Sequence, residues 1–137
     1  MLTETSWPDT RHGYPRRVIH LIARRIRPER RDELTAWLHA VGGPRRAEAL
    51  ASLSAEGIAH EVAVILESAE GPVLVYAMET DDLERARRVA NDSPRPIDAE
   101  HRAVMSQVDG GAVDLKTVLD LFAEPAGPPR GGSTRAC

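Results

Sequence analysis

The order in which two hydrophobic periodicities alternate along this chain is the feature that most constrains its fold. Apolar residues at every second position predict strands, and apolar residues at every third or fourth position predict helices. The 137-residue sequence contains, in order, a strand, a helical region, two strands, a second helical region and a last strand. Two split β-α-β halves have this order, which predicts an α+β ferredoxin-like sandwich with a four-stranded antiparallel sheet and helices on one face.

Turn-forming, helix-breaking and capping residues indicate the bounds of these elements. The strands are expected at residues 17–26, 58–67, 73–79 and 113–122. The first helical region begins at Pro28, a favoured first-turn residue, breaks at residues 42–44 and resumes at 45–55. In the second region, a helix capped by Thr80 or Asp81 precedes a break at residues 91–96. Another helix then runs from Asp98 to the Gly110-Gly111 pair.

The two ends of the chain differ in composition from its middle. Residues 1–15 show little periodicity, and residues 124–137 are rich in Gly, Pro, Ser and Thr. We expect a flexible N-terminal arm at 1–15, one α+β domain at 16–123 and a disordered tail at 124–137. A chain of 137 residues is long enough for one hydrophobic core and too short for two domains.

Charge and composition exclude several partners and point to a compartment. A net charge of −3 argues against nucleic-acid binding, which needs a basic surface. The N-terminus lacks a signal-peptide layout, and no apolar run approaches the roughly 20 residues that span a bilayer. Cys137 is the only cysteine, so no disulfide forms within one chain. We expect a cytoplasmic protein with no membrane partner. Lys116 is the only lysine among many arginines, which is typical of a GC-rich bacterial genome.

The strands are apolar on both faces, although the order of elements provides helices for only one. In the first strand Val18 and Ile22 alternate with Ile19 and Leu21. The remaining face needs cover, and a second copy of the chain supplies it most simply, sheet against sheet. The sequence therefore predicts a homodimer.

His101 points most directly to chemistry. It shares one helix face with Ile97, Val104, Met105 and Val108, and such a face normally packs on a sheet. An imidazole directed into the interior needs a partner or a ligand. His101 is therefore either a general base or ligand contact, or a half-buried histidine bonded to a carboxylate or carbonyl.

Glu61 is the second candidate, because it alternates in a strand with Ala63 and Ile65. A buried carboxylate needs a partner. Glu61 either forms an ion pair, for example with Arg25, or orients His101 or holds a polar group of a substrate. A register shift of one residue would place the neighbouring His60 in the pocket instead.

Further residues complete the set of candidate substrate contacts. Tyr76 either offers its phenol to the pocket or lies in the core, and Trp37 belongs to the apolar stripe of the first helix. Asp114 either contacts a substrate or caps the turn after the glycine pair. The histidines do not follow a metal-ligand spacing, and no Gly-rich phosphate loop or Gly-x-Ser-x-Gly elbow is present. We expect no metal and no cofactor.

Four short motifs carry a resemblance to a known family. They are Ile97-Asp98 followed by His101, Val113-Asp114-Leu115, His60-Glu61-Val62 and Val75-Tyr76. Over residues 17–122 the chain resembles a small bacterial family of unknown function. That family is grouped with the dimeric α/β-barrel proteins, a superfamily that includes antibiotic-biosynthesis-type monooxygenases. The resemblance implies that Glu61, His101 and Asp114 occupy the positions that the pattern of this family marks. The chain differs from the family pattern one turn after the histidine, where family members often carry Trp and this chain has Val104-Met105.

These expectations combine into two functional hypotheses. The first is a small cofactor-independent enzyme of isomerase, cyclase or monooxygenase type, acting on an apolar, partly oxygenated small molecule in bacterial secondary metabolism such as antibiotic biosynthesis. His101 would be the general base, Glu61 would orient or polarise, and Tyr76 would donate a hydrogen bond. The second is a non-catalytic homodimeric module that binds a ligand or a protein.

Overall fold

The computed structural model describes residues 18–123 of the chain, so the expected arm at 1–15 and the expected tail at 124–137 lie outside the described residues. The elements are β1 (Val18–Ile26), η1 (Pro28–Arg30), α1 (Arg31–Gly42), α2 (Arg46–Glu56), β2 (Ile58–Ser68), β3 (Gly71–Thr80), α3 (Leu83–Asp92), α4 (Pro96–Val108) and β4 (Asp109–Val113). This order is α+β and agrees with the predicted sequence of strands and helices.

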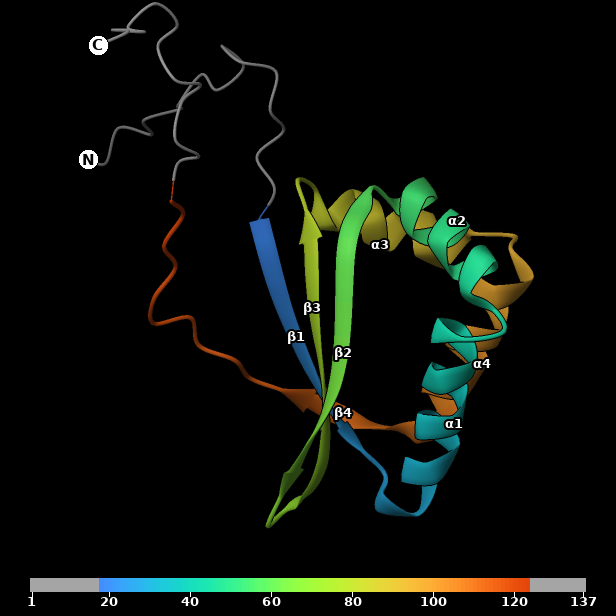
Figure 1. Ribbon diagram of the computed structural model, residues 1–137. Helices are drawn as coiled ribbons and strands as arrows, with labels where there is room; N and C mark the ends of the chain where they lie inside the picture. Colours follow the sequence, from blue (N-terminus) through green and yellow to red (C-terminus); the bar gives the residue numbers. More distant parts are fainter. Residues whose placement is uncertain (1–17, 124–137) are drawn as a thin grey trace, which may run out of the picture.

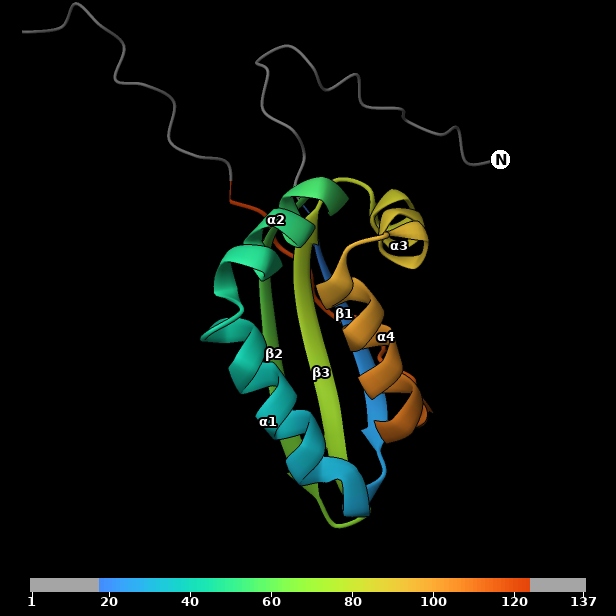
Figure 2. The ribbon, with the colours of Figure 1, turned by 90° about the vertical axis from the view of Figure 1, so that its right-hand side faces the viewer.

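The molecule has two layers, a sheet and a set of helices on one of its faces (Figure 1). The four strands are antiparallel in the order β2-β3-β1-β4. In Figure 2, which looks onto the helical side, α1 and α4 lie along the sheet on either side of β3, and α2 and α3 lie near one end. The predicted ferredoxin-like sandwich is confirmed.

The core lies between the sheet and the two long helices. Leu74 of β3 and Ile26 of β1 pack against Leu34 of α1 and Val108 of α4. Both leucines are fully buried, and burying a side chain of this size stabilises a fold by about 1.5–3 kcal/mol. This cluster fixes α1 and α4 on the sheet and thereby sets the distance across the space between them.

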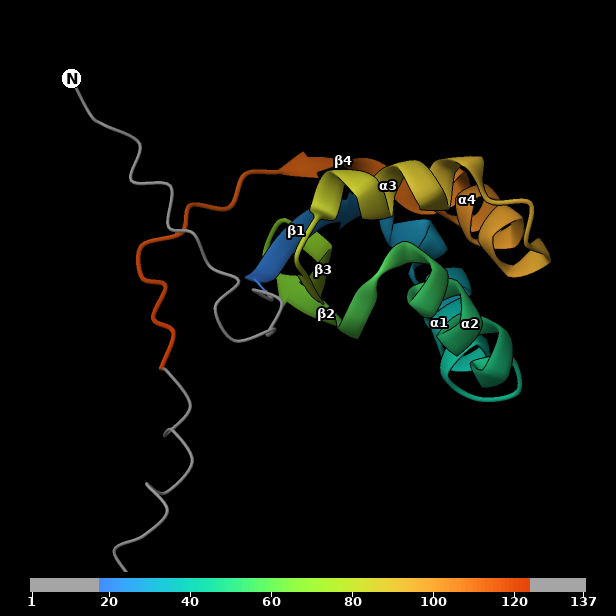
Figure 3. The same ribbon diagram turned by 90° about the horizontal axis from the view of Figure 1, so that it is seen from above.

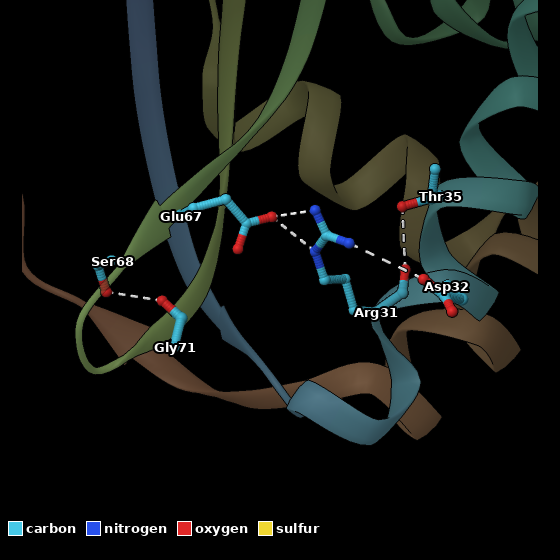
Figure 4. Close-up of polar contacts among 6 residues, drawn as sticks. All are labelled: Arg31, Asp32, Thr35, Glu67, Ser68 and Gly71. Atoms are coloured by element: carbon cyan, nitrogen blue, oxygen red, sulfur yellow. Dashed lines mark hydrogen bonds and ion pairs between the residues drawn. The ribbon is translucent and has the colours of Figure 1, made fainter.

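A second set of contacts ties the β2–β3 hairpin to the start of α1 (Figure 4). The Arg31 guanidinium donates hydrogen bonds to the Glu67 carboxylate, with its Nε 2.6 Å from Oε1. Within the hairpin the Ser68 hydroxyl donates to the carbonyl of Gly71 at 2.6 Å. These bonds are exposed, so they orient the hairpin more than they stabilise it.

A β-bulge at Ala59 changes which side chains of β2 face the helices. Ile58 lies opposite Thr80 and His60 lies opposite Glu79, so Ala59 has no partner of its own in the ladder. A bulge of this kind shifts the alternation by one residue. Ile58 is therefore on the helical side together with Glu61, whereas strict alternation predicted opposite faces for these two residues.

The last strand is the main correction to the predicted elements. The structure places β4 at Asp109–Val113, whereas the sequence predicted a strand at 113–122; residues 114–123 have no regular structure. Gly110 and Gly111 lie inside this strand instead of ending α4. Gly111 has φ +119°, and a side chain at Gly110 would come within 3.3 Å of the Arg25 carbonyl, so the strand itself requires both glycines.

The turn between β3 and α3 is built on two side chains. Asp82 caps α3, because its carboxylate accepts a hydrogen bond of 3.0 Å from the backbone N–H of Arg85. Thr80 is almost fully buried, and its hydroxyl donates to the carbonyl of Gly57 at 2.9 Å. The cap is thus one residue after Asp81 and two after Thr80, the two positions expected from the sequence. Among the residues that the structure describes, no helix has the length and hydropathy needed to cross a membrane.

Candidate functional site

A cavity of about 830 Å³ lies between the helical face of the sheet and the helices α1, α2 and α4. Its volume falls within the range of small-molecule sites. Apolar side chains such as Leu38, Leu53 and Ile97 form part of its wall. Five of the six predicted site residues border it: Trp37, His60, Glu61, Tyr76 and His101.

Glu61 reaches the cavity from β2 because its place in the register with β3 puts its side chain on the helical face of the sheet. It lies opposite Met78 in the register, on the same face as Ala63 and Ile65. Burial raises the pKa of the Glu61 carboxyl to about 7, and the nearby Glu56 carboxylate adds to the effect. The Arg25 partner considered from the sequence is instead paired with Glu70, at 3.3 Å. Near neutral pH, Glu61 can therefore both lose and accept a proton.

Tyr76 comes from the neighbouring strand and places its phenol in the same space. It lies directly opposite Ala63 in the register, and its hydroxyl is buried without a hydrogen-bond partner among the described residues. Burial, together with the Glu61 carboxylate, raises the pKa of the phenol above its usual value, so the hydroxyl keeps its proton. A buried hydroxyl without a partner costs about 1–3 kcal/mol. A ligand oxygen in the cavity would supply the missing acceptor.

His101 enters from α4 and is held by Trp37 of α1. The indole N–H donates to Nδ1 of His101 at 2.9 Å, so the neutral imidazole carries its hydrogen on Nε2. Burial lowers the pKa of His101, and Arg102 adds to this, while Asp98 opposes it. The His101 ring is 6.3 Å from that of Tyr76, edge to face. At neutral pH His101 is a hydrogen-bond donor through Nε2.

Trp37 is itself positioned by a cation. The Arg45 guanidinium lies 5.7 Å from the indole centroid and forms ion pairs with Glu48 and, across to α4, with Glu100. Arg45 thus connects the first turn of α2 to α4 over the outer face of the tryptophan. This arrangement fixes the indole, and through it the imidazole.

The two remaining predicted residues lie at the margin of the site or outside it. His60 borders the cavity but is exposed and lies opposite Glu79, whereas Glu61 takes the inward position. Asp114 is exposed, follows β4 directly and does not border the cavity.

Sequence reasoning missed a cluster of polar residues at the α2–α4 side of the cavity. Asp98 accepts hydrogen bonds on both carboxylate oxygens, from the hydroxyls of Ser52 and Ser93. The Ser52 hydroxyl is also 3.0 Å from Glu56, and burial raises the pKa of that carboxyl. Ser52, Leu53 and Glu56 share the inward stripe of α2 with i, i+1 and i+4 spacing. Two polar residues in that stripe were the signal that could have revealed the cluster.

The chemistry open to this arrangement is proton transfer next to a polarised oxygen. The sheet wall of the cavity carries the Glu61 carboxyl, with a pKa of about 7, and the neutral phenol of Tyr76 on the neighbouring strand, and α4 contributes His101, whose Nε2 carries the hydrogen. No group of three or more His, Cys, Asp or Glu side chains within residues 18–123 could hold a metal ion.

Fold and cavity together define an α+β protein of the ferredoxin-like type with a polar pocket between its sheet and its helices. Residues 18–125 match a family of unknown function, DUF6176, and the chain belongs to this family. No characterised protein and no solved structure matches the chain significantly.

Proposed function

We propose that this protein binds an apolar, partly oxygenated small molecule in the cavity and moves a proton on it without a cofactor, as an isomerase or cyclase does. The observation that carries the proposal is the position of the Glu61 carboxyl, which borders the cavity from the helical face of β2. Burial raises its pKa to about 7, a value suited to proton transfer at neutral pH. Tyr76 borders the same cavity, and its buried hydroxyl has no hydrogen-bond partner among the described residues.

The proposed step begins with a ketone or related carbonyl compound. The Glu61 carboxylate removes a proton from the carbon next to the carbonyl. The electron pair of that C–H bond forms a C=C bond, and the π pair of the carbonyl moves to its oxygen, which gives an enolate. Tyr76 and His101 donate hydrogen bonds to this oxygen as its charge grows. When the carbonyl compound carries a β,γ double bond, Glu61 then returns the proton to the γ-carbon, the double bond moves into conjugation with the carbonyl, and an isomerisation is complete. Alternatively, the enolate carbon attacks a second carbonyl, which then takes the proton, and a ring closes. A monooxygenase reaction of the same enolate would need dioxygen as a further reactant.

This proposal exchanges the roles expected from the sequence. His101 was expected as the general base and Glu61 as the orienting group. Because Nδ1 of His101 already accepts the Trp37 N–H, the nitrogen left for a ligand is Nε2 with its hydrogen. We therefore assign the donor role to His101 and the base role to Glu61.

The superfamily, the oligomeric state, the compartment and the biological role of the protein are also part of the proposal. We place DUF6176, and with it this chain, among the dimeric α/β-barrel proteins, and we infer a cytoplasmic bacterial homodimer that acts in secondary metabolism such as antibiotic biosynthesis. We propose neither a nucleic-acid nor a membrane partner. A sheet whose one face has no helices among residues 18–123 supports the homodimer.

A non-catalytic ligand-binding module is the second candidate. The Trp37–His101 hydrogen bond favours it, because it gives the imidazole a structural role that requires no chemistry. Under this hypothesis Glu61 and Tyr76 would hold polar groups of a ligand, and nothing would be turned over.

One experiment separates the two candidates without knowledge of the product. Aromatic and polyketide-like carbonyl compounds are screened by ¹H–¹⁵N NMR for shifts at cavity residues, and each bound compound is then incubated with the protein in D₂O. The enzyme hypothesis predicts that its α-hydrogens exchange for deuterium, and that Glu61→Gln abolishes exchange but keeps binding. The control Glu84→Gln removes an exposed carboxylate of α3 and leaves exchange unchanged. Binding without exchange in the native protein favours the binding module.

A further inference from the structure

The sheet face opposite the helices is apolar in its centre and charged at both ends. The register aligns its residues in rows across β2, β3 and β1, and the two central rows are Val62, Ala77, Leu21 and Val64, Val75, Ala23. The row at one end contains Glu79, and the row at the other end contains Arg25. An apolar centre with a polar rim is the composition of a protein interface.

Five large apolar side chains on this face are exposed to solvent in the single chain. The exposed fractions of Ile19, Leu21, Val62, Val64 and Leu66 lie between 44% and 66%. None of the helices within residues 18–123 lies on this side of the sheet (Figure 3). Monomeric proteins rarely expose a contiguous apolar patch of this kind.

The segment after β4, which we call the C-terminal arm (residues 114–122), exposes even more apolar surface. Val118, Leu119, Leu121 and Phe122 are 72–86% exposed, and Leu115 is 48% exposed. Figures 1 and 3 show this segment running away from the sheet on the side opposite the helices. An interface that used the open face alone would leave these side chains in water.

The arm and the open face have matching patterns. Val113 of β4 lies opposite Ala23, so it belongs to the open face. In an extended chain Leu115, Leu119 and Leu121 fall on the same side as Val113, because they are an even number of residues away. In an extended arm, these leucines therefore form a row of apolar side chains that continues the open face beyond β4.

We propose that the C-terminal arm of one copy packs on the second copy of the chain, so that the dimer interface consists of the two open faces and two exchanged arms. This inference rests on the homodimer proposed above. The charges of the face favour a second copy as the occupant. A two-fold axis across the strands brings Glu79 of each copy to the end of the face that carries the partner subunit's Arg25, so the surface is complementary to itself.

The first test is the concentration dependence of the dimer, measured by analytical ultracentrifugation of the full chain. The arm variant replaces Val118, Leu119, Leu121 and Phe122 with Ser. The matched control replaces the polar residues of the same arm, Lys116, Thr117 and Asp120, with Ser. We expect the native protein and the control to dimerise alike and the dissociation constant of the arm variant to rise at least about 100-fold.

The outcomes separate the arm from the dimer itself. A dimer of unchanged affinity in the arm variant overturns the arm exchange and leaves the homodimer standing. A native protein that stays monomeric at several hundred micromolar overturns both. Neither result bears on the cavity, because NMR shifts of cavity residues on ligand binding are measured separately.

Isotope-filtered NMR shows which copy the arm contacts. In a mixture of ¹³C-labelled and unlabelled protein, the inference predicts intermolecular NOEs between methyl groups of Leu119 or Leu121 and methyl groups of Leu21 or Val64. If the arm methyl groups contact the open face only within one copy, the exchange is wrong. A charge test completes the set: Glu79→Arg and Arg25→Glu should each weaken the dimer, and their combination should restore it. An additive loss in the double variant contradicts the antiparallel arrangement of the two faces.

Discussion

Trp37 donates a hydrogen bond of 2.9 Å from its indole N–H to Nδ1 of His101, which joins α1 to α4 across one wall of the cavity. The bond fixes the imidazole as the tautomer with its hydrogen on Nε2. Protonation of the imidazole at Nδ1 would break this hydrogen bond. Through this contact, a residue of the first helix determines what a residue of the last helix can do.

Replacing Trp37 with Phe is expected to release this constraint. Nδ1 of His101 loses its donor while the apolar bulk is largely kept, so we expect a loss of about 1–3 kcal/mol in the free energy of unfolding. The ¹⁵N shifts of the imidazole should report a mixture of tautomers in the variant and the Nε2–H form alone in the native protein. Unchanged stability together with unchanged ¹⁵N shifts would show that the bond does not set the tautomer.

Glu61→Gln is expected to stabilise the protein at alkaline pH. Because burial raises the pKa of Glu61 from 4.5 to about 7, the folded state holds a proton that the unfolded state releases between these values. The free energy of unfolding therefore falls as the pH rises from about 4.5 to 7, by about 3 kcal/mol in total. Gln has no charge to bury, so the variant should gain up to this amount at pH 8.

Chemical denaturation of both proteins from pH 4.5 to 8.5 measures this difference. His101, whose pKa is lowered by burial, makes both proteins less stable at acid pH and cancels in the comparison. Glu84→Gln, which removes an exposed carboxylate, should parallel the native profile. Parallel profiles for the native protein and Glu61→Gln would mean that Glu61 titrates normally.

Tyr76→Phe is expected to leave stability unchanged or to raise it by about 1 kcal/mol, because it removes a buried hydroxyl that has no partner within residues 18–123. The same variant should bind a carbonyl ligand of the cavity about 10-fold more weakly, since it lacks one donor. Thermal unfolding and an NMR titration measure the two effects. A clear loss of stability would indicate that the hydroxyl has a partner in the folded protein.

Asp82→Ala is expected to cost about 1 kcal/mol of stability, because the carboxylate caps α3 through the Arg85 N–H. The matched control is Asp81→Ala, one residue earlier, where the carboxylate makes no such bond. Urea denaturation distinguishes the two variants. Equal losses in both would contradict the assignment of the cap.

The sequence predicted the order and type of the elements because their apolar periods differ clearly, but two local features were beyond it. The bulge at Ala59 leaves no compositional trace, and it puts Ile58 and Glu61 on one face. The strand Asp109–Val113 contains two glycines, which normally mark a helix end; the close approach of Gly110 to Arg25 and the positive φ of Gly111 explain them. The apolar residues that predicted a strand at 113–122 belong instead to the exposed arm.

For the site, helical periodicity was enough to predict that His101 and Trp37 face inward. Strand alternation was enough to predict the same for Tyr76. Their mutual contacts were not predictable, because they depend on how α1 and α4 meet over the sheet. Ser52 and Glu56 were missed because a serine and a glutamate on a helix usually face solvent, and here the Ser52 hydroxyl lies within hydrogen-bond distance of both Asp98 and Glu56. Asp114 was included through its motif, and the structure places it away from the cavity.

The pKa of Glu61 is the quantity on which the proposed chemistry depends most directly. A ¹³C NMR titration of the glutamate side-chain carboxyls, with Glu61→Gln to assign the resonance, measures it. We predict a midpoint near 7. A midpoint near 4.5 would mean that Glu61 is an ordinary solvated carboxylate, and it would contradict its role as the base.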